Sequence, residues 1–307
     1  MLRTSGFAIL ALVLPLASPC WSQELETCTS VHFAETGWTD LALTTETARH
    51  VLTALGYETK SDMLGLGIIY ESLESGSIDA FLGYWPLAQV EFQPYYDRNA
   101  AIVLGDNLEN TKFTLAVPTY VADAGVKTFA DLARFADRFD KKIYGIGSGA
   151  PANISLQEII KKNDFDLGQW KLIESSEQAM LAEVSRAVKK QKFVTFLGWT
   201  PHPMNVQLKM HYLKGGEKYF GDSGQVNTLA RKGYAAQCPN VGKLLSNLTF
   251  TQEMENSIMD QVLSKQASND AAIKAWLQAN PQVLDGWLQG VKTLDGGDGL
   301  AAVKAQL

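Results

Sequence analysis

The stretch Phe196-Leu197-Gly198-Trp199-Thr200-Pro201-His202-Pro203 joins an apolar run to an abrupt turn. With Phe193-Val194-Thr195 before it, Phe196-Leu197 predicts a buried strand. The glycine and the two prolines end that strand and begin a loop, so Trp199 is expected where the strand gives way to the loop. Open α/β sheets bind their ligands at this edge.

The same pattern occurs twice more, nearer the N-terminus. Phe81-Leu82-Gly83-Tyr84-Trp85-Pro86 repeats the strand end, and Val31-His32-Phe33 is followed by Gly37-Trp38-Thr39-Asp40. A Trp side chain is large, mostly apolar and normally part of a core. Three of them at ligand-facing strand ends predict an aromatic pocket. The alternative is that each ring only fills the end of its own lobe.

Apolar runs and helical patterns alternate along most of the chain. The predicted strands and helices are, in order, strands at 31–33, 57–59, 78–82, 112–117, 142–146, 170–173 and 193–197, and helices at 41–55, 67–74, 129–139, 153–162 and 177–190. This alternation predicts an α/β fold with a mostly parallel sheet. The 307 residues are enough for about two domains. Since no linker separates two halves, we expect two lobes between which the chain crosses twice, at 112–117 and 208–213.

The composition narrows the class of protein. The chain is 46% hydrophobic and 20% charged, which is typical of a globular protein in solution, and its net charge is −6. The absence of a basic cluster argues against nucleic-acid binding. The four histidines lack the spacing of metal ligands, and no motif indicates a nucleophile, a metal or a redox cofactor. These features favour a binding protein without metal or cofactor over an enzyme.

The N-terminus has the pattern of an export signal. Arg3 precedes an apolar run at 7–16 that is too short to span a membrane, and small and polar residues follow. We expect residues 1–23 to be a signal peptide and the mature protein to be exported. Cys20 is a poor candidate for a lipid anchor, because Ala17-Ser18-Pro19 before it does not resemble a lipobox.

Two cysteines remain once the signal is removed, Cys28 and Cys238. A pair of cysteines in an exported protein predicts a disulfide. Closing so long a loop would stabilise the fold by about 4–5 kcal/mol in the chain-entropy account. The alternative is a pair of free buried thiols, which an oxidising compartment disfavours.

Asp40 lies two residues after Trp38 on the same proposed rim. A carboxylate beside aromatic rings suits a cation, since each ring face attracts a quaternary ammonium ion by about 0.5–1 kcal/mol when exposed and about 2 kcal/mol when desolvated. Three or four rings would supply most of the roughly 8 kcal/mol that micromolar affinity requires. Asp40 is also placed to cap the following helix, and both roles are compatible.

Three other features each allow a functional and a structural interpretation. The Gly147-Ser148-Gly149 turn follows a strand and precedes a helix, so its N–H groups either hold an anionic or polar ligand group or only make a tight turn. His202 is either a ligand contact or a hydrogen-bonded loop residue. Asp295 and Asp298 lack the full spacing of a calcium loop, so a turn before the last helix is favoured.

Several motifs carry a resemblance that covers nearly all of the mature chain. They are Gly-Trp-Thr-Asp at 37–40, Phe-Leu-Gly-x-Trp at 81–85, Glu-Ser-Ser-Glu-Gln at 174–178, Phe-Leu-Gly-Trp-x-Pro-His-Pro-Met at 196–204, Cys-Pro-Asn-Val-Gly-Lys-Leu-Leu at 238–245 and Asp-Gly-Gly-Asp-Gly-Leu-Ala-Ala-Val-Lys at 295–304. Together they resemble the glycine betaine/proline-betaine type of ABC-transporter substrate-binding protein, and most closely its choline-binding members.

The resemblance implies a type II periplasmic binding protein fold, with two α/β lobes joined by two crossing strands and closing around the ligand. Lobe 1 would comprise 24–113 and 210–307, and lobe 2 would comprise 114–209. A monomer that delivers its ligand to a cognate permease and ATPase is expected.

The resemblance also implies the residues of the site. Trp38, Trp85 and Trp199 match the aromatic box that holds a trimethylammonium group in this family. The fourth wall is usually a Tyr, and here it is Phe113, which keeps the ring face but lacks the hydroxyl. Asp40 matches the carboxylate that binds the hydroxyl of choline.

The segment 147–153 departs from the family pattern. An Asn that usually joins the carboxylate aligns with Ala150, with Asn153 as a possible substitute, and the usual Glu-Pro-Gly is Gly147-Ser148-Gly149 here. A ligand with its own carboxylate would benefit from N–H donors in this turn but would be repelled by Asp40. We therefore expect choline, with glycine betaine, carnitine or trimethylamine N-oxide as alternatives.

Overall fold

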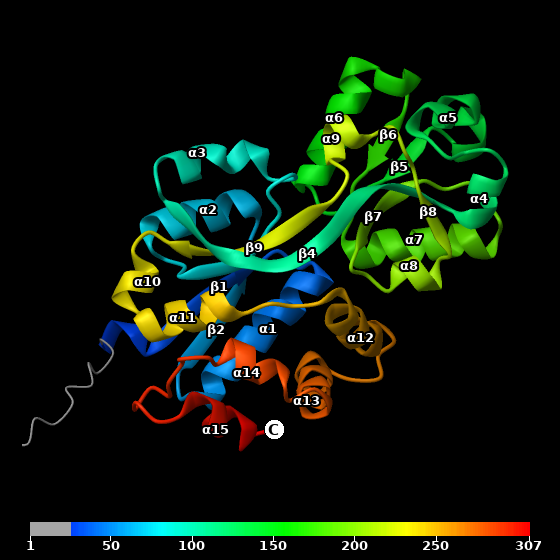
Figure 1. The fold of residues 1–307 in the computed structure, drawn as a ribbon. Coiled ribbons are helices and arrows are strands. Elements are labelled where there is room, and N and C mark those ends of the chain that lie inside the picture. Colours follow the sequence, from blue (N-terminus) through cyan, green and yellow to red (C-terminus); the bar gives the residue numbers. More distant parts are fainter. Residues whose placement is uncertain (1–25) are drawn as a thin grey trace, which may run out of the picture.

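The computed structural model describes residues 26–307, which form two lobes around a curled sheet (Figure 1). The predicted signal peptide at 1–23 and Cys20 lie outside the described residues. Nine strands pair in the order β2-β1-β3-β9-β4-β7-β5-β6, and β8 pairs with β4. The strands are β1 (Ser30–Glu35), β2 (Glu58–Met63), β3 (Ala80–Tyr84), β4 (Ala101–Pro118), β5 (Lys142–Tyr144), β6 (Lys171–Ile173), β7 (Phe196–Thr200), β8 (Met210–Tyr212) and β9 (Gly224–Arg231).

Strand β4 holds the two lobes together. Its first part, from Ala101 to Thr111, pairs antiparallel with β9, and Lys112 to Ala116 pairs antiparallel with β7. The prediction of a strand at 112–117 was therefore too short, because β4 has 18 residues and serves both lobes. Figure 1 shows β4 running from one group of helices into the other, with β9 beside it in the first lobe.

The return of the chain to the first lobe follows a different path from the one expected. The segment 208–213 contains β8, which pairs with the far end of β4 at Ala116–Pro118 and so lies in the second lobe. The chain comes back between β8 and β9, and β9 then pairs with both β3 and β4. The expectation of two crossings is confirmed, but the second lies after residue 213.

The helices cover the two halves of the sheet separately (Figure 1). Those of the first lobe are η1 (Glu26–Cys28), α1 (Thr39–Ala54), α2 (Leu66–Ser75), η2 (Val90–Phe92), α3 (Gln93–Asp97), α10 (Tyr234–Gln237), α11 (Pro239–Asn247), α12 (Gln252–Leu263), α13 (Asn269–Ala279), α14 (Val283–Trp287) and α15 (Gly299–Lys304). Those of the second are α4 (Thr119–Asp123), α5 (Phe129–Arg134), η3 (Ala136–Phe139), α6 (Pro151–Lys162), η4 (Asp164–Asp166), α7 (Glu177–Lys189), α8 (Met204–Gln207) and α9 (Glu217–Phe220). Over residues 26–307, no helix has both the length and the apolar character needed to cross a membrane.

The central strands are apolar because helices cover both faces of the sheet. All five residues of β3 are buried, as are Val31, Phe33 and Ala34 of β1. Near-continuous burial is typical of parallel strands in an α/β protein. The apolar runs that predicted strands thus form the core, and the loops after β1, β3 and β7 reach the boundary between the lobes.

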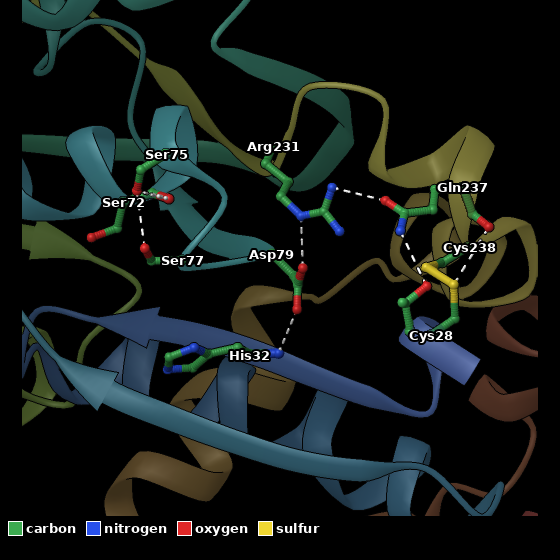
Figure 2. A network of polar contacts seen from close by, with 10 residues as sticks. Cys28, His32, Ser72, Ser75, Ser77, Asp79, Arg231, Gln237 and Cys238 are labelled. Atoms are coloured by element: carbon green, nitrogen blue, oxygen red, sulfur yellow. Dashed lines mark hydrogen bonds and ion pairs between the residues drawn. A yellow bond between two sulfur atoms is a disulfide. The ribbon is translucent and has the colours of Figure 1, made fainter. Parts of the chain in front are cut away.

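The predicted disulfide joins Cys28 to Cys238, with their Cα atoms 5.5 Å apart. Figure 2 shows a polar network beside it. Asp79 accepts hydrogen bonds from the backbone N–H of His32 and from Arg231 Nε, at 2.9 and 2.8 Å, and Arg231 also donates to Gln237, the residue before Cys238. The disulfide and this ion pair together fix the start of β1 to the far end of β9.

Candidate functional site

A cavity lies between the lobes. Its walls are mostly aromatic and aliphatic, and the one charged side chain among them is a carboxylate. The lining residues are Trp38, Asp40, Trp85, Ala88, Phe113, Ile146, Pro151, Ala152, Leu197, Gly198 and Trp199. The three tryptophans predicted from the strand ends are therefore brought to one cavity, together with Phe113 and Asp40.

The loop between β1 and α1 supplies Trp38 and Asp40. Gly37 has a φ of +79°, a conformation that favours glycine, and it turns the chain sharply at the end of β1. Trp38 then occupies the N-cap position of α1, and Asp40 lies in the first helical turn. A carboxylate is stabilised there by the helix dipole. The loop thus places one ring and one carboxylate two residues apart on the same wall.

Trp85 follows β3 directly and comes from the same lobe. It is 7% exposed, and its ring meets that of Phe113 edge to face with centroids 6.0 Å apart. A Cβ at Gly83 would lie 2.7 Å from Leu41 Cδ2, so glycine there lets β3 pack closely against α1. This close packing holds Trp85 near the start of α1, where Trp38 and Asp40 lie.

Phe113 and Trp199 lie side by side on neighbouring strands. They are direct partners in the antiparallel register of β4 and β7. Strand β7 begins at Phe196 and ends at Thr200, so the prediction of a strand over 193–197 placed it three residues too early. Trp199 consequently lies within the strand, and the pairing with β4 fixes its backbone.

Asp40 is a buried carboxylate with an unused acceptor. It is 5% exposed, and its Oδ1 has no hydrogen-bond partner among the described residues. Burial, and next the nearby charge of Glu177, raise the pKa of Asp40 to about 7. An unpaired buried acceptor is costly, so this oxygen is available to a ligand that brings a donor or a positive charge.

A smaller cavity lies behind Asp40. Asp40 and Trp85 line both cavities, and Glu255 of α12 lines the smaller one. Glu255 is 3% exposed, and its Oε2 also lacks a hydrogen-bond partner among the described residues. Burial, followed by the charge of Asp40, raises the pKa of Glu255 well above its ordinary value. Both carboxyl groups are therefore more easily protonated than exposed ones, which limits the negative charge at this end of the site.

Ala150 and Asn153 do not line the main cavity. Asn153 is fully buried; its Oδ1 accepts from the N–H of Ile146, and its Nδ2 donates to the carbonyls of Ile146 and Gly147 and to Glu174. Its amide thus holds the turn at 147–149 in place. That turn presents Pro151 and Ala152 to the cavity rather than its glycines.

Glu177 was not predicted as a functional residue, and His202 was expected to be either a ligand contact or a hydrogen-bonded loop residue; both lie beside the site. Glu177 Oε2 accepts from the backbone N–H of Thr39 at 3.0 Å, and its Oε1 lies 3.3 Å from His202 Nε2. His202 is a hydrogen-bonded loop residue whose ring lies edge to face against Trp199, with centroids 5.0 Å apart. Glu177 lies in the Glu-Ser-Ser-Glu-Gln motif, but the motif does not indicate its hydrogen-bond partner, which lies 138 residues earlier.

Among residues 26–307, no group of His, Cys, Asp and Glu is arranged to hold a metal ion.

The fold and the interlobe cavity define a binding protein, and comparison with known proteins identifies its family. The chain belongs to the OpuAC family, the substrate-binding domains of ABC-type glycine betaine transport systems, which it matches over residues 29–279. The family consists of transport proteins that bind a substrate, and not of enzymes.

Solved structures show the same fold in full. An ABC-transporter choline-binding protein in complex with choline is 45% identical, with a TM-score of 0.90, over 92% of this chain and 99% of that one. The unliganded semi-closed form of such a protein has the same identity and coverage but a TM-score of 0.84. The conformation described here is therefore nearer to the liganded form. The two-lobed type II fold expected from the sequence is confirmed.

A more distant relative comes from Listeria monocytogenes. The glycine betaine/carnitine transport binding protein of that organism is 29% identical over 160 residues. The match covers 52% of this chain and 53% of the relative, so it spans about half of that protein.

Proposed function

We propose that this protein captures choline in the periplasm and delivers it to the permease and ATPase of an ABC transporter. The observation that supports this most strongly is the composition of the cavity, in which four aromatic rings surround a space bordered by one buried carboxylate with a free oxygen. The similar protein that holds choline has the same fold at 45% identity. The protein is proposed to act as a monomer.

The rings of Trp38, Trp85, Phe113 and Trp199 are proposed to hold the trimethylammonium group. Such an ion cannot donate a conventional hydrogen bond, so recognition depends on the negative faces of aromatic rings and on burial of its methyl groups. Desolvated rings each contribute about 2 kcal/mol. Four rings then account for most of the binding free energy of a micromolar ligand, which is about 8 kcal/mol.

Asp40 is proposed to select the hydroxyl end of choline. Its free Oδ1 would accept the hydroxyl hydrogen, and its negative charge would complement that of the ligand. A ligand with a carboxylate would place a second negative charge beside a carboxyl that burial and Glu177 already destabilise. This favours choline over glycine betaine and carnitine.

Phe113, Ala150 and Asn153 are proposed to have lesser roles. Phe113 contributes a ring but no hydroxyl, and its edge contacts with Trp85 and Phe220 hold it rigidly. The side-chain amide of Asn153 is occupied by the turn at 146–147 and by Glu174, so we propose that it and Ala150 shape this wall without contacting the ligand.

The lobes are proposed to be 24–113 with the chain from β9 to residue 307, and the segment between these two parts, which includes β8 and α9. They would close over the ligand by bending of β4 and of the segment that connects β8 to β9. A closed form with the ligand inside is what a transporter would recognise and open.

Calorimetric titration of the mature protein with choline, glycine betaine, carnitine and trimethylamine N-oxide tests the proposal. We expect tight binding of choline and at least tenfold weaker binding of the two carboxylated ligands. Preference for a carboxylated ligand or for the N-oxide would overturn choline as the substrate, and failure of all four to bind would overturn the aromatic cage itself.

A further inference from the structure

Glu177 is the first residue of α7 and one of the most deeply buried charged groups of the structure. Its side chain is 1% exposed. Burial of an unpaired carboxylate is strongly unfavourable, so its partners decide whether the surrounding structure is stable. Both oxygens have partners, and the N-terminus of α7 adds a favourable dipole.

Two of the three donors come from the opposite lobe. The backbone N–H of Thr39 donates to Oε2 at 3.0 Å, and the Thr39 hydroxyl donates to Oε1 at 2.5 Å. Thr39 belongs to α1, which packs against β1 and β2 of the first lobe, whereas α7 belongs to the second. These hydrogen bonds can therefore exist only when the lobes are together.

The bond to Thr39 also completes the start of α1. The first N–H groups of a helix have no partner within it, and the N-cap residue usually supplies one. Here the N-cap is Trp38, whose side chain makes no capping hydrogen bond. Glu177 takes that role from across the interface. When the lobes separate, the backbone N–H of Thr39 and the carboxylate of Glu177 must each form hydrogen bonds with water instead.

The third donor connects Glu177 to the other wall of the cavity. His202 Nδ1 accepts from the backbone N–H of Met204 at 3.0 Å, so in the neutral ring the proton is on Nε2, which faces Glu177 Oε1 at 3.3 Å. The ring also packs against Trp199. Glu177 thus joins the segment that carries Trp38 and Asp40 to the segment that carries Trp199.

We propose that Glu177 is a closure latch, a positioning residue that holds the two lobes together around the bound cation and sets how long the ligand stays. This inference rests on the proposed binding function. Closure also places Glu177 near Asp40, and the two negative charges oppose each other. A cationic ligand beside Asp40 relieves that repulsion, so the latch favours closure over a cation and disfavours closure over an empty or anionic site.

Stopped-flow tryptophan fluorescence with choline as the probe tests the latch. In Glu177→Gln the charge is lost and an NH₂ group replaces one carboxylate oxygen, so that position no longer accepts from the N–H of Thr39 or of His202. We expect the dissociation rate constant of choline to rise about 10- to 100-fold, as loss of a charge-assisted hydrogen bond predicts, with the association rate constant unchanged. Thr39→Val should raise it about 3- to 10-fold, and Thr39→Ser should restore it.

Three controls make the result specific. Gln207→Ala removes an exposed hydrogen bond across the same interface, from Gln207 to Asp260 at 3.1 Å, and should change dissociation less than twofold. Glu183→Gln makes the same chemical change on the outer face of α7 and should have no effect. In the double variant that combines Glu177→Gln with Thr39→Val, the effects on the dissociation rate should be less than additive, because both substitutions act on the same contact.

Two further readouts separate the possible failures. Small-angle scattering with saturating choline should show a larger radius of gyration for Glu177→Gln than for the wild type, and circular dichroism should show that the variant is folded. A folded variant that releases choline at the wild-type rate and closes fully overturns the latch. Absence of choline binding by the wild type would instead overturn the proposed function.

Discussion

The aromatic cage and the acidic cluster behind it are neighbouring parts of one site built on opposite physical principles. The cage, formed by Trp38, Trp85, Phe113 and Trp199, is apolar and packed through ring contacts. The acidic cluster, formed by Asp40, Glu177 and Glu255, contains buried carboxyl groups, each 5% exposed or less. Removal from water stabilises the aromatic rings of the cage. The same removal from water destabilises the charged forms of the carboxyl groups in the acidic cluster.

This difference assigns different tasks to the two parts. Rings attract any quaternary ammonium ion, so the proposed role of the cage is to supply affinity without much discrimination. Each carboxyl responds to a particular partner, since Glu177 has donors from both lobes, Asp40 has an unpaired oxygen, and Glu255 has its pKa raised. We infer that the acidic cluster determines which cation is retained and when the lobes close.

Among changes to the cage, the largest effect is expected from removing one of its rings. Trp199→Ala should weaken binding of choline and of glycine betaine alike by about 2 kcal/mol or more, roughly 30-fold, because a desolvated ring face is lost. Calorimetry measures both affinities. Trp276→Ala, a partly buried tryptophan of α13 outside the cavity, is the matched control and should bind normally. Near-wild-type affinity in folded Trp199→Ala would contradict the cage.

The next effect is a pH dependence that only the acidic cluster should produce. The pKa of Asp40 is about 7 in the free protein, and Glu177, His202 and Glu255 are the titratable groups that face it. Since choline is proposed to bind the ionised form, its affinity should be about 10-fold lower at pH 6 than at pH 8 and should level off above about pH 8. In Asp40→Asn this dependence should disappear, and its persistence would assign the titration to another group.

The stability of the free protein should depend on pH in the opposite direction. The ordinary pKa of an Asp in an unfolded chain is near 3.9, so between about pH 4 and pH 7 the folded protein binds more protons at Asp40 than the unfolded chain does. Its free energy of unfolding should therefore fall by a few kcal/mol over this range and then level off. Urea titrations of the wild type and Asp40→Asn at several pH values measure the difference, and identical pH profiles would contradict the raised pKa.

The smallest effect is expected from restoring the residue that the family usually has at the fourth wall. Phe113→Tyr keeps the ring face toward the cavity, so choline affinity should stay within about threefold of the wild type. Calorimetry is again the measurement. A loss comparable to that of Trp199→Ala would show that the ring edge of Phe113, packed against Trp85 and Phe220, is needed in its present form.

The cage could be predicted from sequence because its members share a local context. Each Trp follows a strand-forming run and precedes a turn, as with Trp85 between Gly83 and Pro86. Strand ends of an α/β sheet converge in space, so local patterns imply a common pocket. The disulfide of Cys28 and Cys238 was predictable for a comparable reason, since only two cysteines remain in the expected mature chain.

Within the acidic cluster, Asp40 was predicted from its place two residues after Trp38, but Glu177 and Glu255 could not be predicted from local sequence. Glu177 meets a donor 138 residues earlier, and Glu255 approaches Asp40 only because α12 packs against α1. Nothing in the local sequence distinguishes these glutamates from exposed ones on the same helices. The burial of Glu177 depends on the two lobes being together, and that of Glu255 depends on the packing of α12 against α1, so spacing along the chain carries no information about either.

The most direct test of the account is calorimetric titration of Asp40→Asn with choline and with glycine betaine. The variant keeps the shape of the side chain and removes its charge, so the cage is left intact. We expect choline to bind about 10- to 100-fold more weakly than in the wild type, while glycine betaine binds as well as before or better. An equal loss for both ligands would contradict the claim that this carboxylate selects the ligand that the aromatic cage holds.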